Sequence, residues 1–318
     1  MLGANLGHSL MPAHESFNPK GFWEHAEIVA VHEHLLAALG SSWHDERQLA
    51  ESWWKLPLVI PFRTTIMEIV QRDFAQSLLW ILKDPRLCRL LPMWLDILQE
   101  TECKPHFVIV LRHPFDVAES LKRRDGFIEE KSYLLWLEHL LESVQWSYGY
   151  PRVVVTYDCL LADWQSTAKL ISKHLSLSWP MGYSSVAAKI EDFLEPSLCH
   201  NGAPKVTPED DRLAELALAA YEIAIRMPPD QLGQALAGIS EEVQRISRLV
   251  SPWACCTNHA LKQVQDLQTK YNQLEHMNAG SLAEIERIKS SISWQITKPL
   301  RFIWNALSLL FFNGSRRP

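Results

Sequence analysis

The stretch His106-Phe-Val-Ile-Val-Leu-Arg112-His-Pro-Phe-Asp-Val-Ala-Glu-Ser120 decides the fold of this 318-residue chain. Its apolar, β-branched run predicts a buried strand over Phe107 to Leu111, because a strand covered on both faces needs apolar neighbours. Pro114 ends the strand, and Asp116 is a suitable residue to open a helix that runs through Lys122. The order of strand, turn and helix predicts one unit of a parallel α/β fold.

Two polar side chains of this stretch predict an anion site. Arg112 follows the strand directly, at the edge where open α/β sheets bind their ligands. Ser120 comes eight residues later, and we expect it about one turn into the following helix, near its electropositive start. A guanidinium and a hydroxyl in these places can hold one phosphate. The alternative is an ion pair between Arg112 and Asp116, with Ser120 packed within its helix.

This segment resembles the 3′-phosphate-binding motif of sulfotransferases that use 3′-phosphoadenosine 5′-phosphosulfate (PAPS). In that family an arginine after a strand and a serine eight positions later hold the 3′-phosphate, which implies PAPS-binding roles for Arg112 and Ser120. Other segments resemble the bacterial members of the family in the same order, over roughly residues 1 to 200. They are Asn18-Pro-Lys-Gly-Phe-Trp-Glu24, Lys83-Asp-Pro-Arg86, Leu91-Pro-Met-Trp94, Arg124-Asp-Gly-Phe127, Leu135-Trp136, Val153-Val-Val-Thr-Tyr157-Asp-Cys-Leu160 and Phe193-Leu-Glu-Pro-Ser-Leu-Cys-His200.

The resemblance implies transfer of a sulfuryl group from PAPS to a hydroxyl or amine, on an acceptor such as a glycan or lipid, without a metal. Such a transfer needs a base for the acceptor proton. Glu24 is the predicted catalytic base, and His25 is the second candidate. Lys20 is predicted to neutralise the charge of the sulfate, and Lys83 to contact the nucleotide or the sulfate. The alternatives are a surface or helix-start carboxylate for Glu24, a solvated Lys20, and a structural pair of Lys83 with Asp84 or another loop carboxylate.

One part of the family pattern has no counterpart in the sequence. The family begins with a strand and a loop rich in glycine, serine and basic residues, whose backbone N–H groups hold the 5′-phosphosulfate. Here Met1-Leu-Gly-Ala-Asn-Leu-Gly7 resembles the end of the helix after that loop. We therefore expect a sheet without its first strand and with unpaired strand edges. The chain is then a fragment, the product of a misplaced start, or an inactive relative.

Two other functions are open. An inactive relative would bind adenosine 3′,5′-bisphosphate and act as a scaffold. A kinase of the phosphate-loop class is the other alternative, and the absence of a Gly-Lys-Ser/Thr loop counts against it.

The strand pattern predicts the fold class. Three short apolar runs read as strands, Leu78 to Leu82, Phe107 to Leu111 and Val153 to Thr156, with helical spacing between them, as in Tyr133 to Trp146. Alternating strands and helices predict an α/β fold. The resemblance makes this a three-layer parallel sheet of the P-loop-like sulfotransferase type, with its first strand missing.

The C-terminal third predicts helices. We expect a sulfotransferase-like α/β domain over residues 1–203, a helical extension over 204–256, a coiled-coil segment over 257–293 and an apolar, basic tail over 294–318. The extension should hold helices from Asp211 to Arg226 and from Gln231 to Leu249. The coiled-coil segment has a heptad row, in which residues recur at alternating spacings of three and four: Val264, Leu267, Tyr271, Leu274, Asn278, Ser281, Ile285, Ile288 and Ile292. This row is equally compatible with a homodimer and with a lone solvated helix.

The tail and the composition limit location and partners. The apolar run Phe302 to Phe312 is shorter than the roughly twenty residues that cross a bilayer, so it lies in a membrane interface or docks on the protein itself. A net charge of −6 argues against a broad nucleic-acid surface. The six cysteines lack paired C-x-x-C spacing, which predicts reduced thiols and no zinc site. No secretory signal is evident, so we expect a cytoplasmic protein, peripheral to a membrane if the tail binds one.

Overall fold

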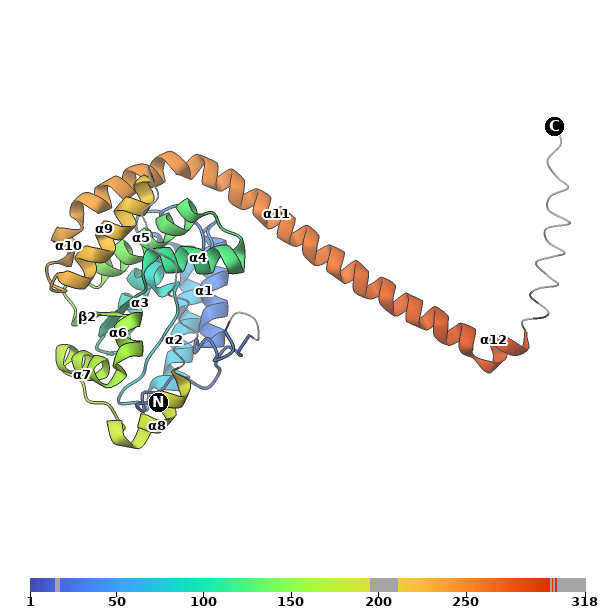
Figure 1. Ribbon diagram of the computed structural model, residues 1–318, viewed down its shortest axis with the longest axis horizontal. Helices are drawn as coiled ribbons and strands as arrows, with labels where there is room; N and C mark the ends of the chain where they lie inside the picture. The colour runs from blue at the N-terminus through green and yellow to red at the C-terminus, as the bar shows by residue number, and fades with distance from the viewer. Residues whose placement is uncertain (15–17, 195–210, 298, 300, 302–318) are drawn as a thin grey trace. The chain divides into compact units, whose positions relative to one another are not determined.

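The computed structural model describes residues 1–14, 18–194, 211–297, 299 and 301 (Figure 1). The chain divides into two compact units, Met1–Ala254 and Cys255–Pro318. In the first unit, helices surround a small parallel sheet, which places the fold in the α/β class.

The sheet of the described residues has two strands, β1 (Phe107–Leu111) and β2 (Arg152–Thr156). They pair in parallel, from Phe107 opposite Arg152 to Leu111 opposite Thr156. Both strands were predicted, and β2 begins one residue before its apolar run. The α/β class is therefore confirmed, whereas the three-layer arrangement is not seen in the described residues.

The third predicted strand, Leu78 to Leu82, is wrong. This segment makes a single parallel bridge, between Trp80 and Asn5. The Asn5 N–H donates to the Leu79 carbonyl at 3.0 Å, and the Ile81 N–H donates to the Asn5 carbonyl at 2.8 Å. A ladder grows only where a partner strand continues beside it. The apolar run alone was therefore not sufficient to make a strand.

The edge of β1 away from β2 has no partner strand among the residues that the structure describes. The Phe107 N–H donates to the Pro151 carbonyl at 2.9 Å. Because alternate residues of a parallel strand bond to the same neighbour, the backbone groups of Val108 and Val110 point away from β2. Within the described part of the chain, no strand pairs with that edge. The side chains of Val108 and Val110 are 40% and 57% exposed.

The main core lies around α5 (Glu129–Trp146), which packs against α4 (Pro114–Asp125) and α9 (Arg212–Arg226) (Figure 1). The small buried side chains of α9 allow close approach to α5: Ala214, Ala217 and Ala220. Both helices were predicted from their apolar spacing, and both predictions are confirmed. Asp211 caps α9, because its carboxylate accepts from two backbone N–H groups of the first turn at 3.0 Å.

A second core joins α1 (Ala26–Ala38), α2 (Ile60–Phe74) and α3 (Leu87–Glu100). Two short 3₁₀ turns, Trp53–Lys55 and Pro57–Val59, lead into α2. At the centre, the Trp94 indole donates to His32 Nε2 at 2.9 Å, and His32 Nδ1 bonds Asp84 at 2.7 Å. This buried chain of hydrogen bonds connects α1, α3 and the loop that precedes α3.

The other helices of the first unit cover β2 and the N-terminus. After β2 come α6 (Tyr157–Ala162) and α7 (Trp164–Leu175), whose Leu175 packs on Val153 and Val155. Then α8 (Tyr183–Phe193) lies close to the start of the chain (Figure 1). The Met181 N–H before α8 donates to the Leu2 carbonyl at 3.0 Å.

The start of α4 differs from the prediction. His113, and not Asp116, is the N-cap, and its Nδ1 accepts the Phe115 N–H at 3.3 Å. Pro114 is the first helical residue, because its fixed φ suits that position and its missing N–H needs no partner there. Since the N-cap lies three residues earlier than predicted, Ser120 lies in the second turn of the helix and not in its first.

The last helices also differ from the prediction. In place of one helix from Gln231 to Leu249, the chain forms α10 (Leu232–Ala235) and then α11 (Ala237–Ser290), which continues through residue 249. A short α12 (Ile292–Ile296) follows. The predicted apolar tail, Phe302 to Phe312, and the family-like segment after Leu194 lie outside the described residues. No helix in the described part combines the length and the apolar character needed to cross a bilayer.

A buried carboxyl lies between α5 and α11. Glu138 is 3% exposed, and its Oε1 accepts a hydrogen bond from the Ser247 hydroxyl at 2.5 Å. Its Oε2 has no hydrogen-bond partner in the described structure. Burial raises the pKa of Glu138 to about 8, and burial likewise raises the pKa of Glu142, one turn later, to about 7.

We expect the contribution of Glu138 to the stability of the first unit to fall as pH rises from about 5 to about 8. In the unfolded chain the Glu138 carboxyl has a pKa of about 4.3 and loses its proton above that pH, whereas the folded state keeps the proton. The free energy of unfolding then falls by up to about 1.4 kcal/mol per pH unit for each such group. Glu138→Gln should flatten this profile in part, since Glu142 still titrates.

Urea unfolding followed by tryptophan fluorescence at several pH values measures this slope. Glu130→Gln, an exposed change on the same helix, is the matched control and should keep the wild-type slope. Superimposable slopes for wild type and Glu138→Gln would contradict the assignment.

Candidate functional site

A cavity of about 1760 Å³ lies against β1 in the first unit. Its apolar wall includes Leu78, Ile81, Val108 and Val110. Its polar wall brings together four of the residues predicted from the sequence: Glu24, Lys83, Arg112 and Ser120. The volume exceeds the roughly 300–1,000 Å³ typical of small-molecule pockets, so a nucleotide and a second group can both be accommodated.

Arg112 leaves β1 at its carboxyl end, and its backbone is held by the Trp136 indole, which donates to the Arg112 carbonyl at 3.1 Å. The guanidinium carbon lies 5.8 Å from the centre of the Tyr157 ring. The buried Nε has no hydrogen-bond partner among the described residues. A cation with open donors in a cavity wall is suited to bind an anion.

Ser120 and Arg124 line the same cavity from α4. Their spacing of four residues puts them on one helix face. The Arg124 guanidinium lies 5.3 Å from the Trp43 ring centre, and its Nε donates to Asp125 at 2.8 Å. From the sequence, the run Lys122-Arg-Arg124 either extends the phosphate patch or forms a solvated helix face, and the solvated face is the favoured prediction.

The two neighbours of Arg124 form ordinary surface ion pairs. Lys122 Nζ lies 3.0 Å from Glu129, and Arg123 Nε lies 3.7 Å from Glu119. Neither Lys122 nor Arg123 lines the cavity. Of the three consecutive basic residues, Arg124 is therefore the one placed to act there.

Glu24, the predicted base, is buried and bound to cations. Its Oε1 accepts from Lys83 Nζ at 2.6 Å, and its Oε2 lies 3.7 Å from a terminal nitrogen of Arg86. The expected alternative pair of Lys83 with Asp84 is not formed, because Asp84 bonds His32 at 2.7 Å and Arg86 at 2.9 Å. The predicted base and the predicted cation are thus direct partners, an arrangement that no local sequence pattern indicated.

Lys20 and Tyr157 lie apart from this pair. Lys20 Nζ is 5.4 Å from the centre of the Phe193 ring, and Lys20 does not line the cavity. Tyr157 is the first residue of α6 and does not line the cavity; its ring lies 5.8 Å from the Arg112 guanidinium carbon.

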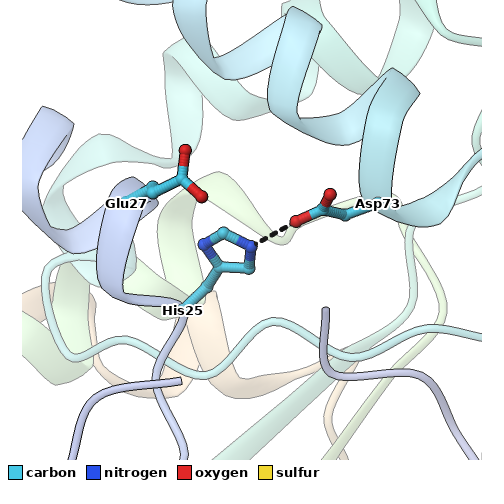
Figure 2. Close-up of side chains that lie close together, drawn as sticks. All are labelled: His25, Glu27 and Asp73. Carbon is cyan, nitrogen blue, oxygen red and sulfur yellow. Dashed lines mark hydrogen bonds and ion pairs between the residues drawn. The ribbon is translucent and has the colours of Figure 1, made fainter. Parts of the chain in front are cut away.

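His25, the second base candidate, has both ring nitrogens engaged. It caps α1, since its Nδ1 accepts the Ile28 N–H at 3.4 Å. Its Nε2 bonds Asp73 of α2 at 2.7 Å, the contact drawn in Figure 2. With 1% of the residue exposed, His25 is a structural link between α1 and α2 and not an accessible base.

His25, Glu27 and Asp73 have the geometry of a metal-ligand group, because one ligand atom of each lies within 4.8 Å of the others (Figure 2). The Arg72 guanidinium, however, binds Glu27 at 2.8 Å and Asp73 at 2.6 Å. Its hydrogen bonds lower the pKa of both carboxyls, and His25 adds to the effect at Asp73. Since arginine already supplies the positive charge, the donors fit an ion-pair cluster better than a metal site.

His25→Ala should destabilise the first unit by about 2–4 kcal/mol, because it removes the α1 cap and one partner of a buried carboxylate. Urea unfolding measures the loss. His34→Ala, an exposed change on the same helix, should cost far less. Equal losses for the two variants would contradict the structural role of His25.

The chain matches no known protein family, no curated protein and no solved structure. The likeness to PAPS-dependent sulfotransferases therefore stays a prediction from the sequence motifs.

Proposed function

We propose that this chain is a PAPS-dependent sulfotransferase of the bacterial type, in which Arg112 and Ser120 hold the 3′-phosphate of the nucleotide. The observation that carries the proposal is the Arg112 guanidinium, which lines the cavity at the end of a parallel strand with a buried Nε that lacks a partner in the described structure. A phosphate oxygen would accept from this nitrogen and remove an otherwise unfavourable buried donor.

The proposal includes the finer fold. In a three-layer, P-loop-like sheet, β1 and β2 would be two of several parallel strands. The open edge of β1, where the backbone groups of Val108 and Val110 point away from β2, is where a further strand would hydrogen-bond. The exposure of both valine side chains supports the same interpretation, because a buried sheet would cover them.

The proposed reaction is an in-line displacement at sulfur. The acceptor oxygen or nitrogen forms a bond to sulfur, the bond from sulfur to the 5′-phosphate oxygen breaks, and adenosine 3′,5′-bisphosphate leaves. The acceptor proton passes to Glu24, while Lys83 and Arg124 offset negative charge on the transferred group and the leaving phosphate. We expect the acceptor to be a glycan or lipid.

One observation favours a second candidate, a catalytically inactive protein that binds adenosine 3′,5′-bisphosphate. Both oxygens of Glu24 lie near cations, at 2.6 Å from Lys83 and 3.7 Å from Arg86. A carboxylate held in this way serves structure as readily as proton transfer. Turnover separates the two candidates, because the binding site is common to both.

Arg112→Ala should weaken binding of adenosine 3′,5′-bisphosphate by about 10- to 100-fold, as expected when a charged hydrogen bond of about 1.5–3 kcal/mol is lost. Ser120→Ala should have a smaller effect in the same direction. Calorimetry with this nucleotide measures both.

Adenosine 5′-monophosphate, which lacks the 3′-phosphate, is the matched ligand, and its affinity should hardly change. Arg123→Ala, on the same helix but outside the cavity, is the matched variant. No binding by the wild type, or equal losses for Arg112→Ala and Arg123→Ala, would reject the nucleotide site.

Glu24→Gln should abolish transfer of ³⁵S from labelled PAPS to mixed glycan and lipid acceptors while leaving bisphosphate binding within about threefold of wild type, because the amide keeps the shape but accepts no proton. Wild-type binding without any transfer would select the inactive candidate. Full transfer by Glu24→Gln would remove Glu24 as the base.

A further inference from the structure

The second unit carries an uncovered apolar row on a long helix. From residue 264 to residue 288 of α11, eight positions recur at alternating spacings of three and four. Two of them are Asn278 and Ser281. The other six carry apolar side chains, each between 45% and 65% exposed: Val264, Leu267, Tyr271, Leu274, Ile285 and Ile288. Helix propensity alone does not stabilise such a helix in water, and an apolar row at this spacing calls for a partner.

The spacing assigns each residue of the row to a heptad position. Val264, Tyr271, Asn278 and Ile285 fall at a, and Leu267, Leu274, Ser281 and Ile288 fall at d. The one asparagine in the row, Asn278, is thus at an a position. In a parallel pair without stagger it meets the same residue of the other copy, where the two amides can hydrogen-bond. An asparagine at a is a known determinant of register and of two-stranded assembly.

The residues that flank the row identify the partner. In a parallel coiled coil without stagger, each g residue faces the e residue of the other helix five positions later. Lys270 then faces Glu275 of the second copy, and Glu284 faces Lys289, so both charged pairs have opposite signs. Within its own helix Glu284 also binds Arg287 at 2.9 Å, which leaves its second oxygen for the partner.

The third flanking pair is apolar and lies where the row is polar. Met277 at g faces Leu282 at e, and these side chains are 68% and 63% exposed. They border Asn278 and Ser281, the two polar positions of the row. Their contact would add apolar burial at the layers where the row itself supplies least.

We propose that residues 264 to 288 of α11 form a parallel, unstaggered, two-stranded coiled coil with a second copy of this chain. The row provides the apolar contact, and Asn278 with the two charged pairs selects the second copy and its orientation. In an antiparallel pair, g residues face g residues and e residues face e residues, so Lys270 and Glu275 do not meet.

A charge exchange on the full-length chain tests the proposal by analytical ultracentrifugation. The wild type should be a dimer. Lys270→Glu and Glu275→Lys should each raise the dimer dissociation constant about tenfold, since two flanking pairs per dimer become repulsive. Lys270→Glu combined with Glu275→Lys should restore the wild-type value. Glu286→Lys, the same type of charge reversal at an outward position, is the matched control and should change the constant by less than about twofold.

Asn278→Leu tests the register. It should tighten association and produce larger or mixed oligomers, because the polar layer that selects two strands is gone. A monomeric wild type would overturn the proposal. A dimer in which each single charge change is harmless, or in which the double change fails to restore association, would overturn the parallel arrangement. A dimer unaffected by Leu274→Glu would place the interface elsewhere in the chain.

Discussion

The parallel pairing of β1 with β2 is the constraint on which the candidate site depends. It determines which backbone groups of β1 are satisfied, and so leaves those of Val108 and Val110 directed away from β2. It also ends β1 at Leu111, which puts Arg112 at the carboxyl edge of the sheet beside the start of α4. Val108, Val110 and Arg112, which line one side of the cavity, are all placed by this strand.

Two buried pairs of histidine and carboxylate hold the other wall of the cavity. His25 with Asp73 ties the start of α1 to the end of α2, and His32 with Asp84 ties the middle of α1 to the loop before α3. Glu24 directly precedes the first pair, and Lys83 directly precedes Asp84 of the second. The two pairs therefore fix the backbone next to Glu24 and next to Lys83. Loss of either histidine–carboxylate pair should shift the contact between Glu24 and Lys83, although neither pair takes part in it.

Short sequence patterns predicted the helices and strands that form from residues close together in the chain. The β-branched runs predicted β1 and β2, and apolar spacing predicted α5 and α9, because each buries one continuous apolar face. Leu78 to Leu82 has an equally apolar pattern and failed as a strand, since a strand also needs a neighbour that continues beside it. The predicted start of α4 was also wrong. Both His113 and Asp116 can cap a helix, and the N-cap in the structure is His113, the residue before Pro114.

The candidate site was predicted in part. Arg112 and Ser120 were chosen because a strand end and a helix start are visible in the sequence, and the structure places both in the lining of one cavity. The bond between Glu24 and Lys83 spans 59 positions, and no periodicity connects residues that far apart. His25 was a candidate base because of its residue type. The structure shows that it is buried and makes two hydrogen bonds, so it caps α1 and links α1 to α2.

The two proposals concern separate parts of the chain, and that separation has a physical consequence. The cavity is lined entirely by residues before 181, whereas the heptad row begins at Val264. No side chain belongs to both, so a change in the row alters association without removing a group that would bind nucleotide. Dimerisation is therefore compatible with an enzyme and with a binding protein alike. What distinguishes them is whether Glu24, between Lys83 and Arg86, can still accept a proton during transfer.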